Sequence, residues 1–223
     1  MVTIPNSVGN SEQLRHLNLS TNGLKVLPES LGNLTKLETL KLNDCRELIM
    51  LPRSTSKLCG LKRLENERCW ELRGMPIGIG QGLSRLEKLS TWVWGSEESE
   101  NIEGLRCLSL LGGSLFIRIE VLRKEDDAAL HDVEEEVLTN KTNLSELVLW
   151  FTFNGGDDVS SSSSEQALRI LKPPSNIESL SIWSYKGRRF PKWMEMSDPH
   201  SSSSFPRLRA IQLQFMQNLE EWV

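Results

Sequence analysis

The chain has 223 residues, of which 38% are hydrophobic, and it carries a formal net charge of -4 at pH 7. A net negative chain has no basic footprint for binding phosphates, so no nucleic-acid partner is expected. No apolar run approaches the roughly 18 residues of a membrane span, and residues 1–10 do not read as a signal peptide, which indicates a cytoplasmic protein.

A leucine pattern recurs from Leu14 onward. Its copies are Leu14-x-x-Leu17-x-Leu19-x-x-Asn22-x-Leu24, then Leu37-x-x-Leu40-x-Leu42-x-x-Cys45, then Leu61-x-x-Leu64 with Cys69. This is the pattern of a leucine-rich repeat, in which a short strand puts alternate leucines on one side and stacked turns share one apolar column. We therefore predict an α/β solenoid, a leucine-rich repeat horseshoe with a parallel sheet on the concave face. Irregular loops and short helices should cover the convex face.

The spacing of the central leucine predicts the domain organisation. The central positions are Leu17, Leu40, Leu64 and Leu89, at intervals of 23, 24 and 25, and then Leu115, Leu147, Leu180 and Ile211, at intervals of 32, 33 and 31. We predict one domain over residues 1–223, with regular repeats over about 1–110 and longer repeats over about 111–223. The first residues copy the tail of a repeat and the last ones follow a strand without a polar cap. The chain is thus expected to be a fragment that begins and ends within the solenoid.

The position of Asn22 is expected to satisfy buried backbone groups where the chain leaves each strand. Cys45 and Cys69 take this position in the next two repeats, where a small buried thiol is a plausible substitute. The four cysteines are neither a disulfide framework nor spaced as a zinc site, so we expect reduced thiols and no bound metal.

Two helices are predicted among the insertions. Residues 126–138 carry one apolar stripe with acids in the first turn, which favours an amphipathic helix on the convex side. A second short helix is predicted from Glu165 to Leu171, ended by Pro173-Pro174. The serine runs at 160–164 and 201–204 are expected to be mobile loops.

Residues between the strand leucines should point away from the core and line the concave face. The candidates for protein binding on the early strands are His16, Asn18, Lys41, Arg63, Glu65, Glu67 and Lys88, and those on the later strands are Trp92, Trp94, Phe116, Arg118, Glu146, Trp150, Trp183 and Gln212. Exposed tryptophans and arginines are frequent hot spots of protein interfaces. We hypothesise that Trp92, Trp94, Trp150 and Trp183 form a protein-contact ridge; the alternative is that some of them cover strand ends or pack under loops.

The order of several elements resembles one family. These elements are Gly112-Gly113-Ser114-Leu115-x-Ile117, the acidic helix, Asn143-Leu144-x-x-Leu147-x-Leu149-Trp150, Leu168-x-x-Leu171-Lys172-Pro173, Asn176-Ile177-x-x-Leu180, and Arg189-Phe190-Pro191-Lys192-Trp193. Together they resemble the leucine-rich repeat region of plant intracellular disease-resistance proteins of the coiled-coil, nucleotide-binding type. Ser11 and Asn66 depart from the pattern, because each stands where a leucine is usual.

This resemblance implies a module of innate immunity that senses a pathogen effector, or a host protein altered by one, and restrains the adjoining nucleotide-binding module. The residues themselves offer no nucleophile, base or metal constellation, so we expect no catalysis and no cofactor. The run Gly78-Ile79-Gly80-Gln81-Gly82 lacks the lysine of a phosphate-binding loop. The alternative function is a cytosolic leucine-rich repeat adaptor, such as the substrate-reading part of a ubiquitin ligase.

Overall fold

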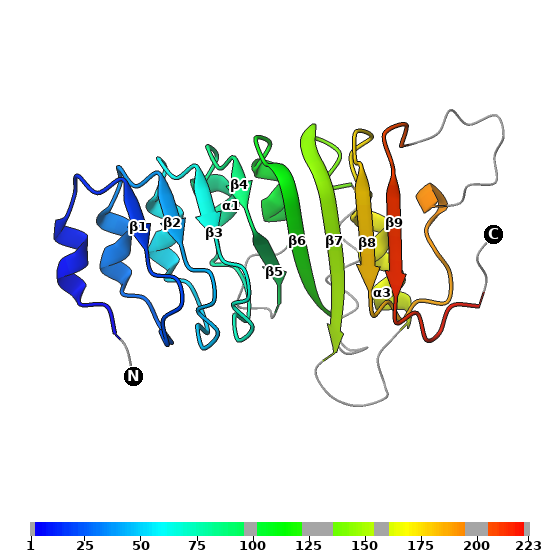
Figure 1. Ribbon diagram of the computed structural model, residues 1–223, viewed down its shortest axis with the longest axis horizontal. Helices are drawn as coiled ribbons and strands as arrows, with labels where there is room; N and C mark the ends of the chain where they lie inside the picture. The colour runs from blue at the N-terminus through cyan, green and yellow to red at the C-terminus, as the bar shows by residue number, and fades with distance from the viewer. Residues whose placement is uncertain (1–2, 96–101, 122–135, 154–160, 195–204, 221–223) are drawn as a thin grey trace.

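The computed structural model describes residues 3–95, 102–121, 136–153, 161–194 and 205–220. Its strands stand side by side in one row, with the helices behind them (Figure 1). A four-stranded sheet contains β1 (His16–Asn18), β2 (Thr39–Lys41), β3 (Arg63–Glu65) and β4 (Lys88–Leu89) in that order. A five-stranded sheet contains β5 (Thr91–Trp94), β6 (Gly112–Val121), β7 (Asn143–Phe153), β8 (Ser179–Trp183) and β9 (Ala210–Gln214). All pairings between neighbouring strands are parallel, which gives the predicted leucine-rich repeat solenoid.

The face opposite the strands carries short helices. The 3-10 helices are η1 (Asn6–Asn10), η2 (Glu29–Asn33), η3 (Arg53–Lys57), η4 (Ile102–Cys107) and η6 (Lys192–Met194), and the α-helices are α1 (Ile79–Gly82) and α3 (Ser161–Ile170). Proline precedes each of the first three 3-10 helices, where its fixed φ suits the extended cap position. Stacking of these helices is tight, because a Cβ on Gly32 would lie 2.4 Å from the Cβ of Ser54.

The predicted column of stacked leucines is confirmed in both sheets. Leu17, Leu40, Leu64 and Leu89 lie opposite one another in register along the first sheet. Leu115, Leu147, Leu180 and Ile211 do the same along the second sheet. The inner members of both columns are at most 2% exposed, so stacking removes their side chains from water.

The turn position after the early strands is filled as predicted. Asn22 donates from Nδ2 to the carbonyl oxygen of Leu19 at 2.9 Å. The thiols of Cys45 and Cys69 are free and buried, and they donate to the carbonyl oxygens of Leu19 and Leu42 at 3.1 and 3.2 Å. Burial raises the pKa of both thiols, that of Cys69 to about 12, so they remain protonated donors.

The register changes by one residue between the two sheets. Leu64 lies opposite Leu89, whereas Thr91 lies opposite Phe116, which puts Ser90 rather than Leu89 level with Leu115. Asn66, the residue that departs from the leucine pattern, lies fully buried at this junction. Its Nδ2 donates to the carbonyl oxygen of Thr91 at 2.9 Å, and its Oδ1 accepts from the Thr91 amide at 3.0 Å. The Asn66 side chain therefore pairs with Thr91 as a strand backbone would.

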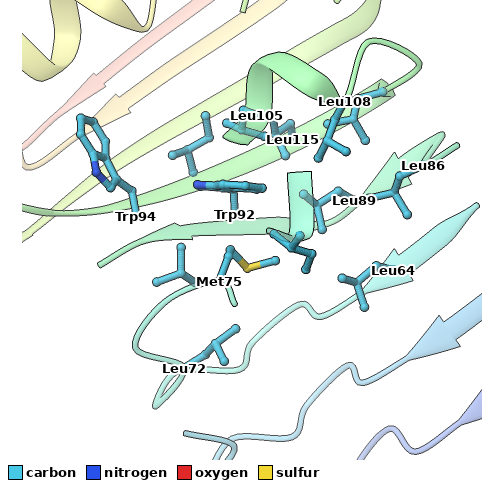
Figure 2. Packing of buried hydrophobic residues seen from close by; sticks show 14 of the residues in the cluster. Leu64, Leu72, Met75, Leu86, Leu89, Trp92, Trp94, Leu105, Leu108 and Leu115 are labelled. Atoms are coloured by element: carbon cyan, nitrogen blue, oxygen red, sulfur yellow. The ribbon is translucent and has the colours of Figure 1, made fainter. Parts of the chain in front are cut away.

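This change of register overturns part of the predicted ridge. Trp92 and Trp94 lie opposite the buried Ile117 and Ile119. Trp92 is 0% exposed and Trp94 is 8% exposed, and both belong to the cluster of buried side chains drawn in Figure 2. The prediction that these two tryptophans face the concave side is wrong. It assumed that side chains alternate without interruption from Leu89, but the one-residue register change at Ser90 turns the following side chains to the other face of the sheet.

The described residues include only parts of the insertions in which helices and loops were predicted. The second helix begins earlier than expected, since α3 runs from Ser161 to Ile170 and buries Ser163 and Ser164. Most of the serine run at 160–164 is thus helical, and the prediction of a mobile loop there is wrong for Ser161–Ser164. The predicted helix at 126–138 lies outside the described residues except for 136–138, which are not helical, so the predicted end of the helix is wrong; Val137 and Leu138 are fully buried there. The serine run at 201–204 also lies outside them.

Candidate functional site

The concave face of the first sheet is polar. His16, Asn18, Arg63, Glu67 and Lys88 are exposed there. Lys41 lies beside Glu65 with 3.3 Å between Nζ and Oε2, and Asn43 donates to the same carboxylate at 3.3 Å. This pairing leaves Glu65 only 9% exposed, so Glu65 supports its neighbours more than it offers a free charge.

Ion pairs link successive repeats along this half. Glu38 lies between Arg15 and Lys62, with Lys62 Nζ 3.1 Å from Glu38 Oε2. Hydrogen bonds from Lys62 and Arg15 lower the pKa of Glu38. Arg68 donates from Nε to Asp44 at 2.7 Å, and this contact lowers the pKa of Asp44. The early half therefore shows a ladder of paired charges, worth little individually because the side chains are solvated.

The concave face of the second sheet carries an aromatic cluster, defined here as Trp70, Phe116, Trp150 and Trp183. Trp150 contacts Trp70 edge-on with ring centroids 6.0 Å apart, and it contacts Phe116 with centroids 6.1 Å apart. Phe116 meets Trp183 at 5.8 Å. Trp70 is 49% exposed and the other three rings are half-buried, so the cluster offers apolar area with fixed geometry to a partner.

A pocket of about 410 Å³ lies against this cluster, at the junction of the two sheets. Trp70, Phe116, Val148 and Trp183 form its apolar walls, and the junction residues Ser90 and Thr91 also line it. A concave site with mainly apolar walls and few polar groups is the usual form of a binding site.

Arg118 lines the same pocket and is only 5% exposed. Its side chain reaches across β5 to the loop after β3, where Nη1 donates to the carbonyl oxygen of Trp70 at 2.8 Å and to that of Cys69 at 3.4 Å. Burial lowers the pKa of Arg118, and the charge of Glu120 opposes this effect. The guanidinium thus ties the second sheet to the first while it keeps a positive charge at the pocket.

The structure separates the predicted site residues into groups. Phe116, Trp150 and Trp183 meet in the aromatic cluster, and Arg118 lines the adjacent pocket with Lys88 and Glu67. Glu146 and Gln212 lie exposed on β7 and β9, outside that pocket, and the protein-binding role of all these residues remains a prediction. Sequence reasoning missed Trp70, because it stands after the strand in the turn that follows Cys69. A bulky aromatic residue at that turn, where the earlier repeats have Gly23 and Arg46, was the available signal.

No feature of the described residues points to metal binding or membrane insertion. Within the described ranges, no three His, Cys, Asp or Glu side chains are grouped as a metal site requires. In the same part of the chain, none of the helices has the length and apolar character needed to cross a bilayer. The aromatic cluster and the adjacent pocket suit binding of another molecule through the concave face.

A family model identifies the repeats of this chain. The family model described as a leucine-rich repeat region matches residues 4–221. A leucine-rich repeat protein of Leptospira interrogans aligns with a TM-score of 0.40 at 16% identity, over 96% of this chain and 69% of that chain. Leucine-rich repeats form a protein-interaction fold that is generally non-enzymatic.

Two curated relatives cover most of the chain. A disease resistance protein of Arabidopsis thaliana is 34% identical over 200 residues, which are 87% of this chain and 14% of that protein. Disease resistance protein RGA2 of Solanum bulbocastanum is 35% identical over 208 residues, which are 82% of this chain and 21% of that protein. The chain therefore spans only 14% and 21% of the length of these relatives. It belongs to the leucine-rich repeat region family and is homologous to plant disease resistance proteins.

Proposed function

We propose that the chain is the recognition and autoregulatory module of a plant immune receptor that acts in the cytoplasm. In this role it senses a pathogen effector, or a host protein modified by one, and restrains an adjoining nucleotide-binding module. The homology to disease resistance proteins supports the receptor context. The observation that carries the recognition role is the half-exposed aromatic cluster of Trp70, Phe116, Trp150 and Trp183 on the concave face.

The two halves of the concave face suit different contacts. The aromatic cluster offers rigid apolar rings, which resemble interface hot spots and suit a sensed protein. The polar early face, with Arg63 and Glu67 exposed, suits a charged contact that holds the nucleotide-binding module and releases it readily. Autoregulation needs such a contact, because a restraint that never opens could not signal.

The test is binding of the 223-residue chain to the nucleotide-binding module of its own receptor, measured by calorimetry. Changing Arg63→Ala and Glu67→Ala together should weaken binding by about tenfold, as expected for loss of exposed charge pairs in an interface. Arg85→Ala is the matched control, because Arg85 is also an exposed cation but precedes β4 rather than lying on the concave strands.

The control should bind as the wild type does. If a folded chain does not bind the module, the restraint is refuted, and an adaptor role becomes the better account of the concave face. Equal binding by the wild type and the double variant would instead move the contact away from the early strands.

A further inference from the structure

The pocket at the sheet junction holds a buried cation, Arg118, that forms no ion pair with a carboxylate among the described residues. Arg118 is only 5% exposed. Both acceptors that its guanidinium contacts are neutral carbonyl oxygens, those of Cys69 and Trp70. Its Nε is buried and has no hydrogen-bond partner among the described residues. Burying a cation in this way is costly unless an anion or further acceptors are supplied.

The acids near Arg118 do not fill this role. Glu120 lies two residues further along β6, and its charge and that of Glu71 act on the guanidinium without contacting it as an ion pair. No carboxylate within the described ranges forms an ion pair with Arg118. The pocket therefore presents a cation with unused donor capacity.

The rim of the pocket adds to this positive character. Lys88 is exposed and forms no ion pair in the described part of the chain, whereas Arg68 is paired with Asp44. Glu67 is the acid on the lining. Lys88 and Arg118 together outweigh it, so the pocket favours an anionic group.

The apolar side chains that line the pocket indicate the kind of ligand that fits it. Phe116, Val148 and Trp183 give an apolar surface beside Arg118, and the Nε1 of Trp183 is buried without a partner in the described structure. A volume of about 410 Å³ lies within the range of pockets that enclose a small ligand or a pair of side chains. The fitting occupant has an apolar body of that size and an acidic group at one end.

We propose that this pocket binds a carboxylate joined to an aromatic or aliphatic body, supplied by a protein partner. The carboxylate is either the C-terminus of the partner or an Asp or Glu side chain next to a large apolar residue. It pairs with Arg118 and Lys88, while the apolar body packs on Phe116 and Trp183. This proposal rests on the proposed recognition function and names the chemistry of the sensed protein.

The test uses small probes with the 223-residue chain and follows the indole N–H signal of Trp183 by NMR. N-acetyl-phenylalanine carries the carboxylate and the ring, and N-acetyl-phenylalanine amide keeps the ring but lacks the charge. The acid should bind about tenfold more tightly than the amide, because a charge-assisted bond in a shielded site is strong. N-acetyl-aspartyl-phenylalanine amide carries the charge on a side chain, so tighter binding of this peptide than of N-acetyl-phenylalanine identifies an internal acidic residue as the source, and the reverse order identifies a C-terminus.

Two variants locate the binding. Arg118→Gln should remove the preference for acid over amide, and Arg85→Gln, a change at an exposed arginine outside the pocket and off the concave strands, should keep it. Because Arg118 also holds two backbone carbonyl groups, its variant can lose stability. Trp183→Ala leaves those bonds in place and should weaken binding of the acid about tenfold. For this variant the indole N–H signal of Trp70, which lines the same pocket, replaces that of Trp183 as the readout.

Equal binding of acid and amide, or binding that neither Arg118→Gln nor Trp183→Ala alters, would overturn the proposal, as would the absence of binding at millimolar probe. Failure of the proposed function would be seen in a different experiment, as the absence of binding between the chain and the nucleotide-binding module. Probe binding and module capture are therefore independent results.

Discussion

Both sheets bury a column of stacked apolar side chains, but the repeats of the first sheet are more regular than those of the second. In the first sheet, strands of two or three residues repeat at intervals of 23 to 25, with leucines in register and charges paired between turns. In the second, strands reach 11 residues, the intervals exceed 30 from β6 onward, and aromatic rings replace the charged ladder. The candidate binding features gather where the regular pattern stops, at the junction held by Asn66 and Arg118. Regular repeats supply the scaffold, and departures from them supply the shape of the site.

The largest expected effect separates the core tryptophans from those of the surface. Trp92→Ala should lower the free energy of unfolding by about 3 to 5 kcal/mol, because it empties a fully buried site. Trp150→Ala should cost about 1 kcal/mol, since its ring is half-buried and loses edge contacts only. Urea denaturation followed by circular dichroism measures both. Similar losses for the two variants would contradict the division into core and surface.

The next effect concerns the junction itself. Asn66→Ala should destabilise the chain by about 2 kcal/mol, because it leaves the partly buried amide and carbonyl groups of Thr91 without these partners. Asn66→Leu restores the leucine pattern but should also destabilise the chain, for the same reason. Asn18→Ala serves as the control, since its bond to the Ser20 amide is exposed. A stabilising Asn66→Leu would show that the junction is not held by this amide.

A third prediction uses a lysine in the longer repeats. Lys141 is fully buried where the early repeats have Leu34 and Leu58, and its Nζ contacts Asn140 Oδ1 at 2.9 Å. Burial lowers the pKa of Lys141 to about 8. Lys141→Met should therefore stabilise the chain by about 2 kcal/mol at pH 7, within the roughly 3 kcal/mol that this lowering represents.

The pH dependence of that gain follows from linkage. Between pH 8 and about 10.5 the unfolded lysine still binds a proton that the folded one releases, so the wild type gains stability as pH rises. The advantage of Lys141→Met should shrink over this window and vanish above it. Chemical denaturation at several pH values checks this, and an advantage independent of pH would refute the role of the buried charge.

The smallest effect is expected from the charged ladder of the first sheet. Glu38→Gln removes the contacts with Arg15 and Lys62, and the lowered pKa of Glu38 means that its contribution is present above pH 4.5 and lost below it. We expect a slight fall in melting temperature at pH 7 that disappears in high salt, because these groups are exposed. A fall that persists in molar salt would mean that the ladder is more than a solvated surface.

The sequence allowed the leucine columns to be predicted because their spacing follows from strand alternation and stacking. It also placed Phe116, Trp150 and Trp183 on the concave side, since the alternation holds within β6, β7 and β8. The orientation of Trp92 and Trp94 was predicted wrongly. A register change of one residue moves the later side chains of the strand to the opposite face, and the alternation of side chains in the sequence does not reveal it. The departure at Asn66 marked the place, but its pairing with Thr91 depends on the neighbouring turn. Trp70 was missed for a related reason, since it reaches the cluster from a turn rather than from a strand.

The most direct test of the register change at Ser90 is hydroxyl-radical footprinting of the folded chain, with oxidation of each tryptophan measured by mass spectrometry. Among the tryptophans of the aromatic cluster, Trp70 should react fastest, and Trp150 and Trp183 should react at intermediate rates. Trp92 and Trp94 should stay protected until the chain unfolds, because they lie in the core. Oxidation of Trp92 as fast as that of Trp70 would contradict the account, since it would place Trp92 on the concave face and remove the junction that shapes the pocket.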